Sequence, residues 1–116
     1  MTGFQLRLRG GNSTLTSYSG RVEVRVGQSG SWGTVCDDYF DHQDATVICK
    51  YLGYKNGIAK PKAHYGAGTG KIFIDDLKCS GTEKNPFSCT HRGWGKHNCN
   101  HDEDAGVICT GRGEFM

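Results

Sequence analysis

The chain has 116 residues, which suits one domain with a modest core, because only 35 % of the residues are hydrophobic while 18 are glycine. The formal net charge of +2 does not by itself imply affinity for nucleic acid. The sequence has no long apolar run and no signal peptide, so we expect no membrane insertion by this segment, which we interpret as part of a larger secreted or membrane-anchored protein.

Apolar and polar residues alternate over residues 4–9 and again over residues 21–26, and each alternation predicts a half-buried strand. Between them, the polar and glycine-containing residues 10–19 indicate a loop. A turn at residues 27–30 leads to a third predicted strand, Ser31–Val35.

The period then changes to that of a helix. Asp41 is a suitable N-cap, and Asp44 lies in the first turn, where a negative charge is favourable. Apolar residues follow at helical spacing and Gly53 is a natural stop, so the sequence predicts a short amphipathic helix over Asp44–Leu52 with Cys49 on its buried face.

The second half of the chain is richer in loops. It contains an irregular segment at residues 56–70, a strand at 72–75, a turn at 81–85, a short helical turn at 86–89 and a final apolar strand at 105–109. Together these elements predict a small, disulfide-rich α+β domain over residues 4–110, in which a curved antiparallel sheet with long loops cradles one main helix. Residues 1–3 and 111–116 are expected to be linker edges.

Six cysteines are present: Cys36, Cys49, Cys79, Cys89, Cys99 and Cys109. An even number in a short, loop-rich chain indicates disulfides formed in an oxidising compartment. Zinc sites instead use close pairs such as C-x-x-C, whereas the nearest cysteines here are ten positions apart. The sequon Asn12-Ser13-Thr14 makes Asn12 a predicted glycosylation site and also favours an extracellular location.

A series of ordered motifs carries a family resemblance. They include Gly20-Arg21-Val22-Glu23-Val24, Trp32-Gly33-Thr34-Val35-Cys36-Asp37-Asp38, Asp44-Ala45-Thr46-Val47-Ile48-Cys49, Ile74-Asp75-Asp76-Leu77-Lys78-Cys79 and His101-Asp102-Glu103-Asp104-Ala105-Gly106-Val107-Ile108-Cys109. From Leu6 to Cys109 the chain resembles the scavenger receptor cysteine-rich domain in its six-cysteine, group A form, as found in collagenous macrophage scavenger receptors.

The resemblance implies the pairs Cys36–Cys99, Cys49–Cys109 and Cys79–Cys89. Two of these close loops of 63 and 60 positions, and in the chain-entropy model each stabilises the fold by about 4 kcal/mol. The fold is then expected to depend on oxidation.

Two acidic segments, residues 37–44 and 102–104, become neighbours if Cys36 is bonded to Cys99. Carboxylates brought together are stabilised by a hard cation, and calcium with oxygen ligands suits them better than magnesium, although magnesium is possible. The resemblance implies one cation site at Asp37, Asp38 and Glu103. It implies a second site at Asp75 and Asn98, with Asp76 close by. The alternative is that these side chains cap turns or face water, which is the role we assign to Asp41 and Asp44.

Basic residues are also unevenly distributed. They form a lysine-rich stretch and a set on the first two strands, and the residues concerned are Lys50, Lys55, Lys60, Lys62, Arg7, Arg9, Arg21 and Arg25. Such surfaces bind polyanions through summed charge, although a solvated surface is the alternative. The resemblance implies that arginine clusters and bound calcium act together on anionic ligands.

Two functions therefore compete. One is extracellular recognition of anionic ligands, namely modified lipoproteins, bacterial surface polymers or sulfated glycans. The other is a protein–protein module of a larger receptor or secreted enzyme, in which the acidic site is structural. We expect no catalysis, because the sequence lacks motifs such as G-x-S-x-G and H-E-x-x-H.

Overall fold

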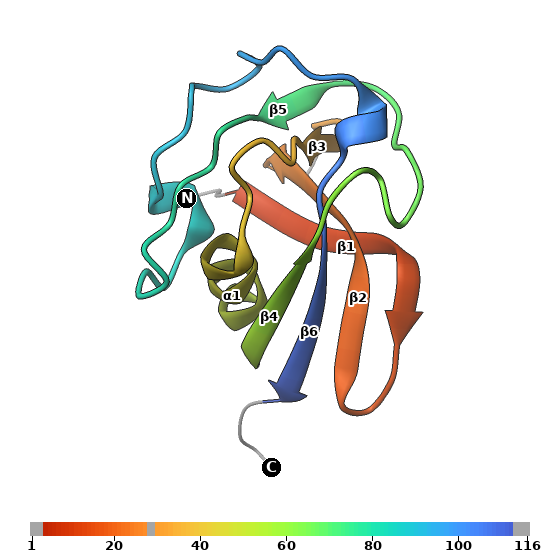
Figure 1. Ribbon diagram of the computed structural model, residues 1–116, viewed down its shortest axis with the longest axis vertical. Coiled ribbons are helices and arrows are strands. Elements are labelled where there is room, and N and C mark those ends of the chain that lie inside the picture. Colours follow the sequence, from red (N-terminus) through yellow and green to blue (C-terminus); the bar gives the residue numbers. More distant parts are fainter. Residues whose placement is uncertain (1–3, 28–29, 113–116) are drawn as a thin grey trace.

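The computed structural model describes residues 4–27 and 30–112, and Figure 1 shows one curved sheet with a single α-helix packed against it. The strands are β1 (Phe4–Ser13), β2 (Ser17–Val26), β3 (Gly33–Val35), β4 (Tyr54–Lys60), β5 (Ile72–Ile74) and β6 (Gly106–Arg112). Helix α1 covers His42–Tyr51, and two 3₁₀ turns, η1 and η2, cover Pro86–Ser88 and His101–Glu103. The predicted α+β class is confirmed.

Strand β2 is the centre of the sheet and is paired along both edges. Strand β1 lies antiparallel along one edge, starting with Phe4 opposite Val26. The other edge is shared, because β6 pairs with residues 17–21 and β3 with residues 23–24. The sheet continues from β6 to antiparallel β4 and from β3 to parallel β5. Because β3 and β5 run in the same direction, the segments that follow them leave the sheet at the same edge.

Helix α1 begins at the predicted cap. The Asp41 carboxylate accepts hydrogen bonds from the backbone N–H groups of Gln43 and Asp44 at 3.0 and 3.2 Å, and the Asp44 carboxylate accepts from the Asp41 N–H at 2.9 Å. These bonds satisfy amide groups that the first helical turn leaves without partners. Asp44 is buried and also accepts from the Cys79 N–H at 2.6 Å, so it joins the helix start to a distant loop.

The core lies between the sheet and α1. Its most deeply buried apolar side chains come from the sheet, from α1 and from the loop after β5, and they include Val22, Val24, Val35, Val47, Ile48, Leu77 and Val107. The Cys49–Cys109 disulfide joins α1 to β6 inside this core. The pairs Cys36–Cys99 and Cys79–Cys89 are also formed, so the expected pairing is confirmed.

Strand β4 corrects the sequence prediction, which made residues 56–70 irregular. Residues Tyr54–Lys60 instead pair with β6 and pack against α1. Gly57 faces the helix so closely that a Cβ would overlap the backbone of Ala45. A glycine is therefore needed where strand and helix approach, although it weakens the sequence pattern of a strand.

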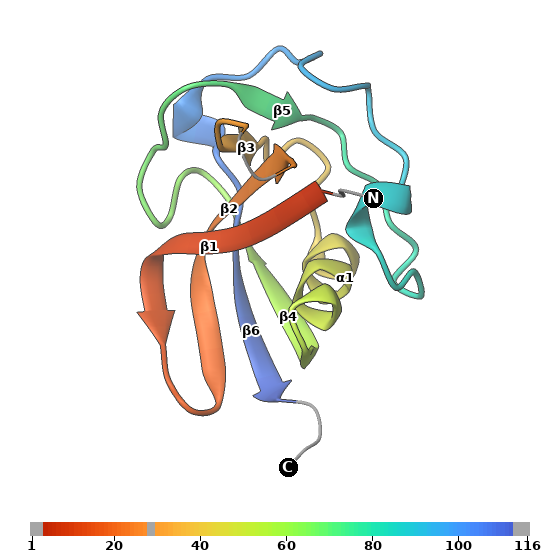
Figure 2. The same ribbon diagram turned by 180° about the vertical axis from the view of Figure 1, so that it is seen from behind.

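Other boundaries also differ from the predictions. Residues 10–19, predicted as a loop, instead form the end of a β1–β2 hairpin. Strand β1 runs to Ser13 and β2 begins at Ser17, so only residues 14–16 connect the two strands. Figure 2 shows this hairpin on the side of the molecule opposite α1. Smaller differences affect other elements: β3 begins at Gly33, α1 begins at His42, β5 ends at Ile74 and β6 runs from Gly106 to Arg112. The predicted turn at 27–30 and linker edges at 1–3 and 111–116 lie partly or wholly outside the described residues.

Candidate functional site

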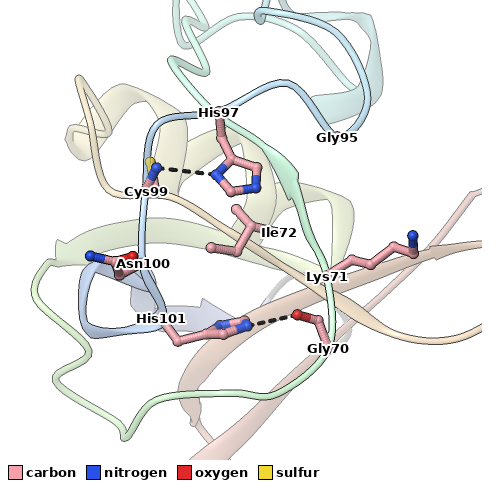
Figure 3. Close-up of a pocket in the computed structure, with 8 residues that line it drawn as sticks. All are labelled: Gly70, Lys71, Ile72, Gly95, His97, Cys99, Asn100 and His101. Carbon is pink, nitrogen blue, oxygen red and sulfur yellow. Dashed lines mark hydrogen bonds between the residues drawn. The ribbon is translucent and has the colours of Figure 1, made fainter.

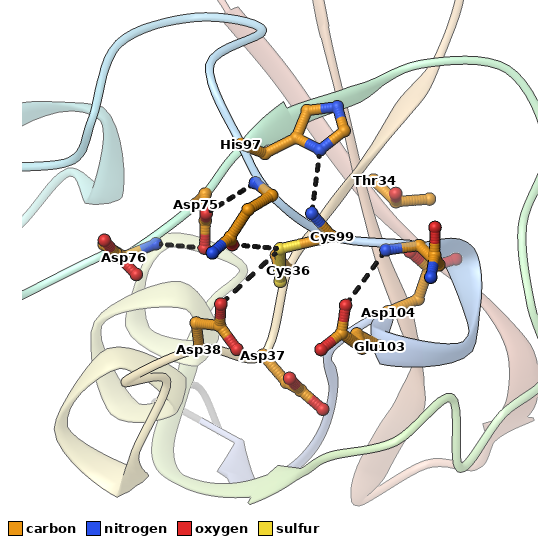
Figure 4. The surroundings of a disulfide bond; sticks show 12 residues. Thr34, Cys36, Asp37, Asp38, Asp75, Asp76, His97, Cys99, Glu103 and Asp104 are labelled. Atoms are coloured by element: carbon orange, nitrogen blue, oxygen red, sulfur yellow. Dashed lines mark hydrogen bonds between the residues drawn. A yellow bond between two sulfur atoms is a disulfide. The ribbon is translucent and has the colours of Figure 1, made fainter.

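Three segments that are distant in sequence converge at one edge of the sheet. The Asp37 N–H donates to the Glu103 carbonyl oxygen and the Cys36 N–H to the Ile74 carbonyl oxygen, both at 2.8 Å. The residues after β3 therefore lie between η2 on one side and the end of β5 on the other. The Cys36–Cys99 disulfide, drawn in Figure 4, adds the loop that carries His97 and Cys99 and, between them in sequence, Asn98.

The predicted first cation set is brought together here. One carboxylate oxygen from each of Asp37, Asp38 and Glu103 lies within 4.8 Å of the others, and all three side chains are half-buried. Backbone donors hold two of them, since Asp37 accepts from the Lys62 N–H at 2.7 Å and Glu103 from the Asn100 N–H at 2.9 Å. An open pocket of about 590 Å³ is lined by Asp37, Asp38, Lys62, Asn98, Asn100, Asp102 and Glu103.

This crowding of carboxylates is electrostatically unfavourable. Burial, followed by the charges of Asp75, Glu103 and Asp37, raises the pKa of Asp38. A divalent cation would offset that repulsion. Calcium binds six to eight oxygen ligands of any kind in flexible geometry, and carboxylates are among them. Three carboxylates therefore fit a calcium ion and leave coordination positions open for water or a ligand.

The predicted second set, Asp75, Asp76 and Asn98, lies next to the first, because a carboxylate oxygen of Asp75 lies within 4.8 Å of one of Asp38. Asp75 is fully buried and its carboxylate accepts from the Asp76 N–H at 2.8 Å and the Asn98 N–H at 3.4 Å. With the Asn98 amide oriented so that its NH₂ group faces the carboxylates, which satisfies its neighbours, it donates to Asp38 at 3.1 Å and to Asp75 at 3.2 Å. Arg92 forms an ion pair with Asp75 at 3.4 Å. The charge of Asp75 is thus already compensated by groups of this chain.

The arginines predicted to bind anions are mostly engaged within the sheet. Glu23 is only 6 % exposed, and its two oxygens form ion pairs with Arg7 and Arg21, both at 2.8 Å. Arg25 donates to the Gln5 side chain at 2.7 Å. Arg9, in contrast, is exposed. The sequence placed these arginines on the first two strands, but it did not show that a buried carboxylate neutralises part of their charge.

Two of these arginines also pack on an aromatic ring. The guanidinium carbons of Arg7 and Arg25 lie 4.1 and 4.6 Å from the ring centroid of Trp32, which is half-buried. Such cation–π contacts restrict the guanidinium groups further.

The predicted lysines are close in sequence but are carried by different elements. Lys50 lies on α1 and donates to the Gly81 carbonyl oxygen at 3.3 Å, Lys55 and Lys60 lie on β4, and Lys62 lines the acidic pocket. The predicted glycosylation residue, Asn12, is exposed near the end of β1, where its backbone N–H donates to the Ser19 hydroxyl.

A second pocket, of about 400 Å³, lies between the start of β5 and the loop that follows Gly95 (Figure 3). The net effect of its surroundings is to raise the pKa of His101. Burial alone would lower this pKa, but the hydrogen bond to the Gly70 carbonyl oxygen and the contact with Asp104 favour the protonated ring and outweigh burial. Asp104 also accepts from the Gly68 N–H at 2.7 Å, so its buried carboxylate holds the loop before β5. Cys99 is in a disulfide, so it offers no thiolate to a transition metal.

Tyr39, which follows Asp38 directly, is not among the predicted site residues. Its side chain is 72 % exposed, and the Lys78 ammonium lies 5.6 Å from its ring centroid. The available signal was an aromatic residue in a turn next to two predicted cation ligands.

Within the described residues, none of the helices has the length and apolar character needed to cross a bilayer.

The chain spans only a small part of two curated proteins of similar sequence. Human lysyl oxidase homolog 3 is 48 % identical over 105 residues, which are 90 % of this chain and 14 % of that protein. A scavenger receptor cysteine-rich domain superfamily protein of Patiria pectinifera is 54 % identical over 106 residues, or 90 % of this chain and 9 % of that protein.

Solved structures show the same fold. The scavenger receptor cysteine-rich domain of mouse MARCO, in its dimeric form, aligns with a TM-score of 0.76 and 44 % identity over 85 % of this chain and 93 % of that one. The third such domain of murine neurotrypsin aligns with a TM-score of 0.78 and 46 % identity over 92 % and 96 % of the two chains. A family model described as the scavenger receptor cysteine-rich domain matches residues 10–110. With its fold and its three disulfides, the chain therefore belongs to the scavenger receptor cysteine-rich domain family.

Proposed function

We propose that this domain captures polyanionic ligands outside the cell, with calcium bound by Asp37, Asp38 and Glu103. The observation that carries the proposal is the approach of three carboxylates within 4.8 Å of one another in an open pocket. A calcium ion there has unfilled coordination positions, which a phosphate, sulfate or carboxylate oxygen of a ligand can occupy. The site residues bind and orient, and no bond is broken.

The family supports the general part of this function. Scavenger receptor cysteine-rich domains are non-catalytic interaction modules of receptors and secreted proteins. The ligand class we propose comprises modified lipoproteins, bacterial surface polymers and sulfated glycans. The exposed lysines and Arg9 add attraction that falls with salt.

We further propose that a second ion binds weakly at Asp75, Asp76 and Asn98. Arg92 already pairs with Asp75, and Asn98 turns its amide N–H groups toward the carboxylates. A cation would have to displace Arg92 and rotate the amide, so this ion should bind less tightly than the first.

Calorimetric titration of the oxidised domain with calcium tests the main site. We expect saturable binding that Asp38→Ala abolishes. Asp102→Ala is the matched control, because Asp102 lines the same pocket but is not one of the three converging carboxylates. Chelation of calcium should then also weaken binding of dextran sulfate. No heat at millimolar calcium, or equal loss in both variants, would contradict the proposed site.

A protein–protein role is the second possibility, and an aromatic cluster favours it. Phe4 stacks on Phe87 and Trp94 with ring centroids 4.6 and 5.2 Å apart, and Tyr51 packs edge-on against Phe87. Phe4 and Tyr51 are 37 % and 39 % exposed, so part of this cluster is accessible. Binding of one protein that persists at high salt and is lost in Tyr51→Ser would support this role over polyanion capture.

A further inference from the structure

Tyr39 has a backbone conformation that bulky residues rarely adopt. Its φ is +60°, and it is the third residue of the turn Asp37–Phe40, which is closed by a 3.0 Å hydrogen bond from the Phe40 N–H to the Asp37 carbonyl oxygen. The third position of a turn with positive φ normally holds glycine or asparagine, because a larger side chain is strained there. Burial of the ring does not offset this strain, because Tyr39 is the most exposed phenylalanine, tyrosine or tryptophan among the described residues. Strain of this kind is typical of functional positions.

The ring and a cation form one surface beside the acidic pocket. The Lys78 ammonium lies 5.6 Å from the Tyr39 ring centroid, and the Lys78 side chain is exposed. The Lys78 N–H donates to the Thr90 carbonyl oxygen at 2.9 Å, which fixes the backbone from which that side chain extends. Lys62 lines the pocket itself and adds a second positive charge nearby. An accessible aromatic face is thus combined with positive charge.

This combination suits a sugar ring that carries sulfate. The face of an aromatic ring has negative electrostatic potential, and the axial C–H groups of a pyranose carry small positive partial charges. A pyranose stacked on Tyr39 would place a sulfate substituent within reach of Lys78. A polyanion without sugar rings would use only the lysines and the calcium ion.

We propose that Tyr39 and Lys78 form a contact surface for sulfated polysaccharides, which the domain recognises by their pyranose rings as well as by their charge. The inference rests on the proposed polyanion-binding function and specifies its ligand class. Tyr39 supplies selectivity for the saccharide, while the neighbouring cations supply attraction that any polyanion shares.

Two polymers that carry the same sulfate group separate these contributions. Dextran sulfate consists of pyranose rings, whereas polyvinyl sulfate has a hydrocarbon backbone. Binding of both to immobilised oxidised domain would be measured in calcium for the wild type, Tyr39→Asn and Tyr39→Phe. Asparagine accepts a positive φ, so Tyr39→Asn relieves strain while it removes the ring. Tyr39→Phe keeps the ring and is the matched control.

We expect Tyr39→Asn to weaken dextran sulfate binding by roughly three- to tenfold, which is the effect of one aromatic contact, and to leave polyvinyl sulfate binding unchanged. Tyr39→Phe should bind both polymers like the wild type. Lys78→Gln should weaken both, because its ammonium meets the sulfate group itself. Tyr39→Asn should bind calcium normally and melt at the same temperature or higher, which would show that its fold is intact.

The contrary outcomes are distinct. Equal weakening of both polymers by Tyr39→Asn, or no weakening of either, would overturn the role of Tyr39 and leave polyanion capture standing. Failure of the wild type to bind either polymer in calcium would instead overturn the proposed function, and this inference with it.

Discussion

At the residue scale, the charged surface of this domain is set by buried carboxylates as much as by exposed cations. Glu23 lies between Arg7 and Arg21 and neutralises half of their joint charge. The two-residue period of a strand places Arg21 and Glu23 on one face of β2, but the sequence did not reveal that Arg7 lies opposite Glu23 or how deeply Glu23 is buried. That depth depends on the cross-strand pairing of β1 with β2.

Glu23→Gln should therefore change both the affinity for polyanions and the stability of the fold. It should raise affinity for dextran sulfate and steepen the salt dependence of binding, because two guanidinium groups lose their shared counter-charge. It should also lower the free energy of unfolding by about 1–3 kcal/mol, because the remaining hydrogen bonds are no longer charge-assisted. Urea unfolding and binding at several salt concentrations measure these effects. Glu83→Gln makes the same change in net charge on a distant turn and should not increase affinity.

Asp44 gives a prediction about pH. Burial, partly opposed by hydrogen bonds from backbone N–H groups, raises its pKa from 3.8 to about 6. Between these two values the folded protein keeps a proton that the unfolded chain releases. The stability contributed by this group is therefore complete below about pH 4 and is lost as pH rises through about 6.

The Asp44→Asn variant cannot titrate at this position, so its unfolding free energy should depend less on pH between about 4 and 6 than that of the wild type. It should be less stable throughout, because an amide NH₂ cannot accept the second of the two backbone hydrogen bonds. Urea unfolding across this pH range tests both effects. An unchanged pH slope would show that Asp44 is not the titrating group.

At the scale of elements, the sequence predicted those helices and strands whose signals lie within one short segment of the chain. Helix α1 was found because its cap and apolar spacing lie within one short segment. Strand β4 was missed because Gly57 is required by contact with α1, which no local pattern reveals. The 3₁₀ turn η2 was also missed, although it carries Glu103. The carboxylates of the proposed cation site were identified through the family resemblance, whereas the compensation of Asp75 by Arg92 became visible only in the structure.

The cap of α1 gives the prediction at this scale. Asp41→Ala removes the acceptor for two backbone N–H groups and should lower the free energy of unfolding by about 1 kcal/mol. Chemical denaturation measures the loss. Gln43→Ala, a change in the same helical turn that leaves the Asp41 carboxylate in place, should cost much less. Comparable losses in the two variants would contradict the capping role.

At the scale of the whole molecule, the disulfides differ in what they hold together. Cys36–Cys99 spans 63 positions and fixes the segment after β3 next to the loop before η2, while Cys79–Cys89 spans only 10. In the chain-entropy model their removal costs about 4 and about 3 kcal/mol, so their contributions to stability are similar. Their contributions to the acidic pocket are not, because only the first joins two segments that line it.

We therefore expect the double variant Cys36→Ala/Cys99→Ala to lose calcium affinity, while Cys79→Ala/Cys89→Ala keeps it. The two variants should be compared by calorimetry at a temperature at which circular dichroism shows both to be folded. Similar calcium affinities would show that the backbone hydrogen bonds between β3, β5 and η2 are enough to form the pocket.

The direction of β6 has a consequence for how the domain is displayed. This strand starts next to η2, beside the acidic pocket, and runs to the opposite end of the molecule (Figure 1). Seven extended residues cover about 20 Å. A domain attached to a surface or a stem through the far end of β6 would hold its pocket outward, away from the attachment point. Several copies on one stem would then present their pockets to the same long polymer, and each pocket already engaged would raise the effective concentration of ligand for the next.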